Sequence, residues 1–309
     1  MTIRRTLPGL TAGALVLSLA LSAVPAANAV AQARGPVATG TRAAAAPGIS
    51  EQQVMPHLRA LQRIADRNGG NRAHGTQGYA QSVAYVKRAL DRAGFRTTLV
   101  PFTHAGTTGH NLIADWPGGD PNHVLLTGAH LDSVPAGPGI NDNGSGSAAV
   151  LATALQVASS GLKPERHLRF AWWGAEEAGL IGSGAYVGKL SEADRRRIDV
   201  YLNFDQAGSK NISQWLVVHD NEHGETEAQQ AFEGWFAERG IPTFDIGVGG
   251  SDHESFGNAG IPSSGFSTGI SDCIHEACDN LGNVDPKTET TSTNAIAGVL
   301  WKLATTPRH

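Results

Sequence analysis

HVLLTGAH, at residues 123–130, is the stretch that decides the fold class, because it is a short apolar run that ends in a histidine. Runs of this length, bounded by Gly, Pro, Asn or Asp, are typical of buried β-strands. Comparable runs predict further strands at 111–116, 167–173, 200–204 and 215–218.

Segments with helix-spaced apolar residues lie between and around these runs. They predict helices at 51–67, 77–93, 145–159, 225–239 and 292–304. Strands that alternate with helices favour a largely parallel sheet that is covered on both faces. Because no repeat or linker divides the body, we predict one α/β domain at residues 46–309. Its expected architecture is a three-layer α/β/α sandwich around a mixed, mostly parallel central sheet.

The start of the chain has the features of an export signal over residues 1–29. A basic start at residues 4–5, an apolar run at 10–20 and the small residues 27–29 fit the three parts of such a signal. The apolar run is too short for a permanent transmembrane helix, and no later segment reaches 18 apolar residues. Residues 30–45 lack apolar periodicity and predict a flexible propeptide or leader. We therefore expect a secreted protein.

The net charge of the chain limits the kinds of binding partner that we expect. The net charge is −4 and the chain has no long basic run. Nothing in this balance indicates a nucleic acid or an anionic membrane as partner. Nothing argues against a monomer, and we expect one.

Side chains suited to metal binding follow the predicted strands. In sheets of this kind, ligands bind at the carboxyl ends of the strands, so these side chains can converge. The candidates are His130, Asp142, the pair Glu176 and Glu177, Asp205 and His275. Taken singly, each of them is more often a helix cap or a satisfied polar group. Together they suit two zinc ions, provided that one carboxylate bridges the ions and a position stays open for water.

The adjacent Glu176 and Glu177 are the most informative feature of this set. Two neighbouring carboxylates at a Gly-flanked strand exit are unfavourable unless positive charge neutralises them. One of them can bind a metal while the other acts as a general base toward water. The alternative interpretation is a solvated acidic turn.

Four motifs connect these residues to a known family: HLDS at 130–133, GINDNGSGSAAV at 139–150, FAWWGAEEAGLIGS at 170–183 and YLNFD at 201–205. With them, the chain resembles the co-catalytic di-zinc aminopeptidases, which include the secreted leucine-preferring aminopeptidases of bacteria. The likeness runs from Ala46 to Leu303, and NRAHGTQGY at 71–79 belongs to it without showing obvious chemistry.

The resemblance implies a role for each candidate. His130 and Asp205 would bind one Zn²⁺, Glu177 and His275 the other, and Asp142 would bridge the two; Glu176 would be the general base. The implied activity is hydrolysis of the N-terminal peptide bond of peptides with a free amino end. Large hydrophobic N-terminal residues are the expected preference.

Two further features near the ligands are implied by the same resemblance. Asp132 would hydrogen-bond the second ring nitrogen of His130 and so fix its tautomer. The peptide bond between Asp142 and Asn143 would be cis.

A related family, the di-zinc carboxypeptidases and deacylases, has the same order of ligands but inserts a lid domain before the last histidine. Only 69 residues separate Asp205 from His275 here. These residues are needed for a further strand, helix and strand, so no room remains for a lid. This spacing favours an aminopeptidase.

The chain departs from the secreted aminopeptidases at three places near the site. Some members have Tyr directly before the last His, as a donor to the tetrahedral intermediate, and here that position is Ile274. An Arg of those members is replaced by Gly250, and the stretch between Gly269 and Cys273 is short by a loop. Two alternatives therefore stay open: a related zinc enzyme, such as a one-zinc glutaminyl cyclase-like protein, and a non-catalytic secreted binding domain.

Cys273 and Cys278 are the only cysteines in the sequence. Their spacing is not that of a C-x-x-C pair, and an exported chain meets oxidising conditions. We therefore predict a disulfide, which would fasten the irregular segment that carries His275.

Overall fold

A computed structural model describes residues 45–212, 214–219, 226–247 and 250–306. These residues fall within one compact unit, Ala43–His309. The predicted export signal, and the predicted leader apart from its last residue, lie outside the described residues. Among the helices of the described part, none is long and apolar enough to cross a membrane.

An eight-stranded sheet is the centre of this unit, with the strand order β1-β2-β4-β3-β5-β8-β6-β7. Its strands are β1 (Arg96–His104), β2 (Thr107–Asp115), β3 (Asp120–His130), β4 (Arg166–Trp173), β5 (Ile198–Phe204), β6 (Trp215–His219), β7 (Thr243–Asp245) and β8 (Ser263–Ser267). The four central strands β4, β3, β5 and β8 pair in parallel, as do β6 and β7. The β1–β2, β2–β4 and β6–β8 pairs are antiparallel. The predicted mixed, mostly parallel sheet is confirmed.

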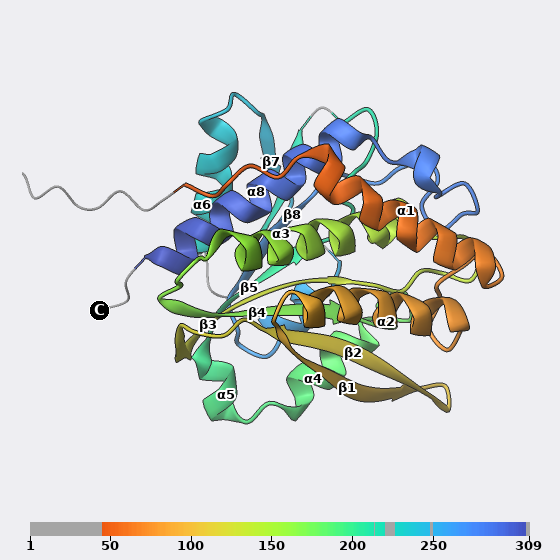
Figure 1. Cartoon of the computed structure of the whole chain (residues 1–309), viewed down its shortest axis with the longest axis horizontal. Coiled ribbons are helices and arrows are strands. Elements are labelled where there is room, and N and C mark those ends of the chain that lie inside the picture. The colour runs from red at the N-terminus through yellow and green to blue at the C-terminus, as the bar shows by residue number, and fades with distance from the viewer. Residues whose placement is uncertain (1–44, 213, 220–225, 248–249, 307–309) are drawn as a thin grey trace, which may run out of the picture. The chain divides into compact units, whose positions relative to one another are not determined.

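Helices cover both faces of the sheet (Figure 1). One layer contains α1 (Glu51–Arg67), α2 (Gln77–Arg92), α3 (Gly146–Ser160), α6 (Glu227–Ala237) and α8 (Pro286–Thr305). The other layer contains α4 (Ile181–Lys189), α5 (Glu192–Arg197) and α7 (His253–Gly257). Two single turns, η1 (Ile140–Ser145) and η2 (Leu281–Asn283), belong to the loops around the site. The three-layer α/β/α sandwich is therefore confirmed.

Burial on both faces explains why the central strands are apolar without alternation. The neighbours Leu125 and Leu126 of β3 are both fully buried, but they belong to two different core clusters. Successive side chains of a strand point to opposite faces, so one leucine packs under each helical layer. The continuous apolar run that starts at residue 123 is thus the signature of a doubly covered strand.

Several elements lack such a signature. β1 exposes most of its side chains, and β8 consists of small residues, SSGFS. α8 begins at Pro286 instead of residue 292, because the Asp285 side chain accepts the N–H of Thr288 at 2.7 Å and caps a polar first turn. The predicted start of this helix, residue 292, therefore lies six residues after the observed start at Pro286.

Candidate metal centre

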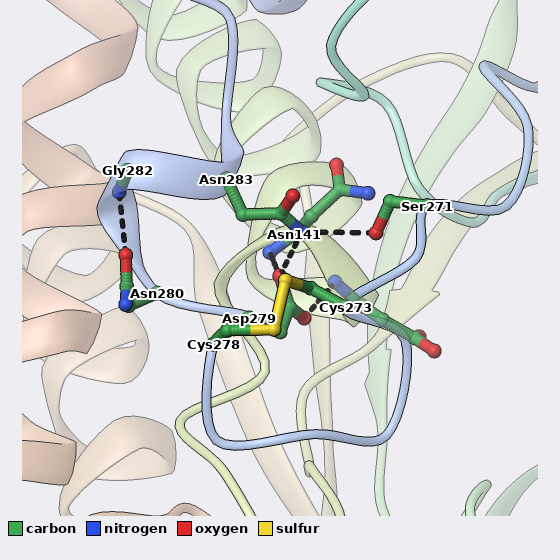
Figure 2. Close-up of a disulfide and its surroundings, with 9 residues drawn as sticks. Asn141, Ser271, Cys273, Cys278, Asp279, Asn280, Gly282 and Asn283 are labelled. Carbon is green, nitrogen blue, oxygen red and sulfur yellow. Dashed lines mark hydrogen bonds between the residues drawn. A yellow bond between two sulfur atoms is a disulfide. The ribbon is translucent and has the colours of Figure 1, made fainter.

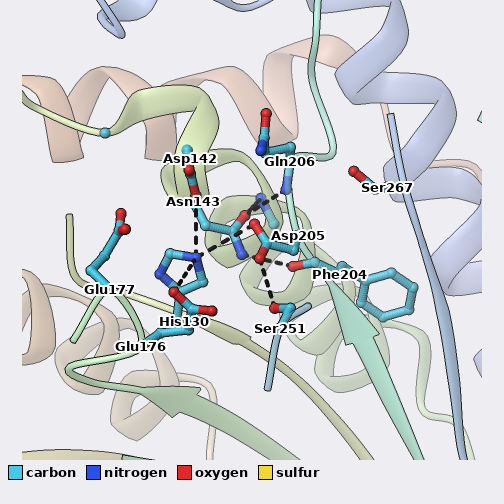
Figure 3. Close-up of polar contacts among 12 residues, drawn as sticks. His130, Asp142, Asn143, Glu176, Glu177, Phe204, Asp205, Gln206, Ser251 and Ser267 are labelled. Carbon is cyan, nitrogen blue, oxygen red and sulfur yellow. Dashed lines mark hydrogen bonds and ion pairs between the residues drawn. The ribbon is translucent and has the colours of Figure 1, made fainter. Parts of the chain in front are cut away.

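The ends of the parallel strands bring the predicted ligands together, and Figure 3 shows His130, Asp142, Glu177 and Asp205 among them. His130 is the last residue of β3, Asp205 directly follows β5, and Glu176 and Glu177 follow β4 after a short turn. Asp142 lies in η1, which connects β3 to α3. His275 comes from the loop between β8 and η2. The structure thus gathers every residue of the predicted site.

The two carboxylate oxygens of Asp142 face different partners. Oδ1 lies 3.3 Å from His130 Nε2, and the same nitrogen lies 3.4 Å from Asp205 Oδ1. Oδ2 lies 3.3 Å from His275 Nε2, which in turn lies 3.0 Å from Glu177 Oε2. The ligands therefore form two groups, each with one histidine and one further carboxylate, and Asp142 is shared between them.

The donor atoms have the chemistry and spacing of a metal site. His130, Glu176 and Asp205 each offer an atom within 4.8 Å of the others, and so do His130, Asp142 and Glu177. Both ring nitrogens of His130 and one oxygen each of Glu177 and Asp205 are buried without a hydrogen-bond partner. Nitrogen and carboxylate oxygen are ligands that zinc accepts. The residues present therefore fit zinc.

Burial makes the two glutamates dependent on nearby positive charge. It raises the pKa of Glu176 to about 9 and that of Glu177 to about 7. For His130, burial opposes protonation, but the carboxylates of Glu176 and Asp205 raise its pKa well above the usual value. Bound cations would favour the charged form of these buried carboxylates over the protonated form.

A network along one face of β5 holds Asp205. Ser251 Oγ donates to Asp205 Oδ2 at 2.6 Å and accepts a hydrogen bond from Asn203 Nδ2 at 3.0 Å. The hydroxyl of Tyr201 donates to Asn203 Oδ1 at 2.7 Å. Residues 201, 203 and 205 lie on the same side of the strand because side chains alternate. The network leaves Asp205 Oδ1 directed toward His130.

Asp132 lies beside His130, as the resemblance implies, but at a longer distance than a hydrogen bond. Its Oδ1 is 3.6 Å from His130 Nδ1. The same oxygen accepts the backbone N–H of Glu176 at 3.2 Å. Asp132 therefore connects the exit of β4 to the exit of β3.

Arg72 is a supporting residue that the sequence did not reveal. Its side chain is fully buried, and Nε donates to the carbonyl of Pro138 at 2.9 Å. The other two guanidinium nitrogens donate to the carbonyls of Leu131 and Gly139. Arg72 thus joins the backbone just after His130 to the backbone just before η1. No local pattern marks such a role in NRAHGTQGY, because its partners are main-chain groups at distant positions.

The side chain of Asp279 also fixes η1, and Figure 2 shows it beside Asn141. Its carboxylate accepts the backbone N–H groups of Asn141 and Asp142, at 3.0 and 2.9 Å. Asp279 directly follows Cys278, whose disulfide with Cys273 closes the loop that carries His275. The predicted disulfide is confirmed, and the expected cis peptide between Asp142 and Asn143 is present. The loop of the second histidine is therefore tied to the shared carboxylate.

A cavity of about 510 Å³ opens onto the site and contains Asp142, Glu176, Glu177, Asp205 and His275 in its lining. The apolar part of its wall comprises Leu216, Val218, Ile246, Phe266, Ile270 and Ile274. A larger hollow of about 690 Å³ lies between residues near the start of the body, α6 and α8, and it contains none of the candidate ligands. We assign function to the smaller cavity because it holds the chemistry.

Comparisons with known proteins agree with this geometry. The model of a family described as Peptidase family M28 matches residues 111–300. Leupeptin-inactivating enzyme 1 of Streptomyces exfoliatus is 47% identical over 98% of this chain and 72% of its own length. An aminopeptidase of Pseudomonas aeruginosa is 37% identical over 62% of this chain, but this match covers only 41% of the relative.

Solved structures show the same fold. An aminopeptidase from Aneurinibacillus sp. strain AM-1 superposes with a TM-score of 0.70 at 18% identity, covering 84% of this chain and 97% of that chain. A zinc aminopeptidase from Bacillus subtilis superposes with a TM-score of 0.59 at 26% identity, covering 66% of this chain and 52% of that chain.

Proposed function

The chain belongs to peptidase family M28, and we propose that it is a secreted two-zinc aminopeptidase, which removes residues from the free amino end of peptides. The relatives named aminopeptidase support the reaction class, and the zinc aminopeptidase of Bacillus subtilis supports the metal. The observation that carries the proposal is the carboxylate of Asp142, whose two oxygens face two separate histidine-containing groups.

Each ligand has a place in this arrangement. His130 and Asp205 would hold one zinc ion, Glu177 and His275 would hold the second, and Asp142 would be shared between them. The zinc pair, when bound, supplies Lewis-acid polarisation of the scissile carbonyl and an activated water. In a one-zinc centre of the glutaminyl cyclase type, one of these two groups of residues would bind no metal.

Glu176 is the general base of the proposed reaction. Its Oε2 lies 3.8 Å from His130 Nε2, so it borders the ligands without belonging to the group around His275. It takes a proton from the attacking water and delivers it to the leaving amine. The backbone N–H that it donates to Asp132 fixes the turn from which its side chain extends.

The residues that line the cavity indicate which N-terminal side chain the substrate has. Its apolar wall can bury a large hydrophobic N-terminal side chain, which contributes roughly 1.5–3 kcal/mol for a residue such as Leu or Phe. The free amino group of the substrate meets the carboxylates around the ligands. This contact would restrict cleavage to the first peptide bond.

We also propose that the protein is exported and that it acts as a monomer. The features of residues 1–29 and the disulfide between Cys273 and Cys278 both suit a secreted protein. We expect the body to act as a monomer on peptides, without nucleic acid or membrane partners.

Hydrolysis of a panel of aminoacyl-anilides tests the proposed activity. The purified protein is assayed after chelation and again after zinc is restored, on substrates with free and with acetylated amino groups. We expect zinc-restored turnover of the free substrates only, fastest with Leu-like side chains. Turnover of acetylated substrates would contradict the exopeptidase assignment. Binding without turnover on the whole panel would favour a non-catalytic domain.

A further inference from the structure

The proposed reaction requires a hydrogen-bond donor that Ile274 cannot supply. Ile274 lines the cavity directly before His275, and its side chain has no group that can donate a hydrogen bond. Negative charge develops on the carbonyl oxygen of the substrate as water adds, and a fixed donor there accelerates the reaction. The cavity therefore needs another polar group with a free N–H or O–H.

Gln206 is held rigidly beside the ligand Asp205. Its backbone is in the left-handed region, with φ 60°, which is uncommon for a residue other than glycine. Its N–H donates to Asn143 Oδ1 at 3.2 Å, and its carbonyl accepts from both the N–H and the hydroxyl of Thr268. Such strained conformations persist where the surroundings fix them, and they concentrate at functional sites.

Hydrogen bonds determine which way the amide of Gln206 is turned. The hydroxyl of Ser209 donates to the carbonyl of Gly269 at 2.6 Å, so its oxygen can only accept from Asn141. Asn141 Nδ2 accordingly donates to Ser209 Oγ at 2.9 Å. The same nitrogen lies 3.2 Å from the side chain of Gln206, which must present its oxygen there. The NH₂ group of Gln206 is therefore the end that remains.

This NH₂ group has no partner among the residues that the structure describes. Gln206 is a lining residue of the cavity that contains Asp142, Glu176 and His275, and only 6% of its surface is exposed. Figure 3 shows it next to Asp205. An oriented but unused donor at a metal centre has the property that an oxyanion site requires. Ser267 also lines the cavity, but no comparable network orients its hydroxyl, whose oxygen accepts the N–H of Gly269.

We infer that Gln206 is a catalytic residue, whose side-chain NH₂ group donates to the carbonyl oxygen of the substrate as the tetrahedral intermediate forms. This role rests on the proposed aminopeptidase function. Gln206 holds its donor in position before the substrate arrives, because Asn141 and Thr268 fix both its amide and its backbone. No part of this role requires Gln206 to bind a metal.

The test compares Gln206→Met with Ser267→Ala, which removes the other candidate donor of the cavity, in the full zinc-loaded protein. Met preserves the length of the side chain but cannot donate, and Asn141 keeps Ser209 as an acceptor. We expect kcat of Gln206→Met to fall roughly 10²-fold, with KM changed less than about threefold. The affinity for an α-amino phosphonate, a mimic of the tetrahedral intermediate, falls by a similar factor. Zinc stoichiometry and thermal midpoint stay at wild-type values, and the loss of kcat in Ser267→Ala is smaller than the loss in Gln206→Met.

Each contrary outcome has a definite meaning. A kcat of Gln206→Met within twofold of the wild type, or a rise in KM alone, would overturn the inference, since the donor would then act in binding or not at all. A large loss in Ser267→Ala without one in Gln206→Met would transfer the role to Ser267. If the wild type hydrolyses no substrate, the proposed function fails together with the inference.

Discussion

Glu289 provides a test of how an unpaired, buried carboxyl group affects the stability of this protein. It lies in the first turn of α8, its side chain is fully buried, and both of its carboxylate oxygens lack a hydrogen-bond partner. A Cβ atom at Gly208 would lie only 2.7 Å from Oε2, so the carboxyl group packs directly against the chain that follows Asp205. Burial raises the pKa of Glu289 well above its ordinary value of 4.5.

We predict that Glu289→Leu stabilises the protein, and that its advantage grows with pH. An unpaired buried polar group is unfavourable by about 1–3 kcal/mol, and Leu of similar size removes this penalty. The folded state also keeps a proton that the unfolded state releases above pH 4.5. Stability of the wild type therefore falls, through this group, by about 1.4 kcal/mol per pH unit between 4.5 and the raised pKa. Below pH 4.5 this pH-dependent part vanishes.

Urea unfolding of zinc-saturated wild type and variant at pH 5, 6, 7 and 8 measures the effect. The difference between the two proteins cancels the titration of all other groups. Glu289→Gln is the matched control, because it removes the titration but keeps a buried polar group. Relative to the wild type, it should show the same pH-dependent gain in stability as Glu289→Leu, but not the pH-independent gain. Parallel stability curves for wild type and Glu289→Leu across this range would refute the reasoning.

Three further predictions concern residues that support the ligands. Arg72→Lys should lower the free energy of unfolding by about 2–4 kcal/mol, because a single ammonium cannot satisfy three separate carbonyls; unchanged urea midpoints would contradict this. Ser251→Ala should weaken one of the two zinc sites roughly 10–100-fold in chelator competition, while the buried control Ser264→Ala, which bonds a distant carbonyl, leaves both sites intact. The double variant Cys273→Ala/Cys278→Ala should lose one zinc on dialysis by freeing the loop of the second histidine; retention of two zinc ions would show that the disulfide is dispensable.

The sequence predicted the elements that are buried on both sides. The run that contains Leu125 and Leu126 could be recognised because each residue packs under a different helical layer. β1 escaped prediction because most of its side chains are exposed. A strand was expected in the part of the chain that contains β8, but it could not be located because its residues are small. The pattern of apolar residues reports double burial, so it does not find elements that lie at an edge or carry small side chains.

The candidate ligands were predictable for a different reason. His130, Glu177 and Asp205 follow strands that the apolar pattern had already located, and the end of a parallel strand is a known place for chemistry. Arg72 and Gln206 could not be found in this way, because they act through main-chain carbonyls and through the orientation of one amide. Such roles depend on contacts between residues far apart in the chain, and a local motif does not contain them.

Glu176→Gln, studied together with zinc stoichiometry, tests the central claim most directly. The variant keeps the shape of the side chain but cannot accept a proton from water. We predict that zinc-restored wild type and variant both bind two zinc ions per chain, while kcat on leucyl-anilide falls by at least roughly 10²-fold in the variant alone. A variant that keeps wild-type turnover, or a wild type that binds a single zinc at saturation, would contradict the account.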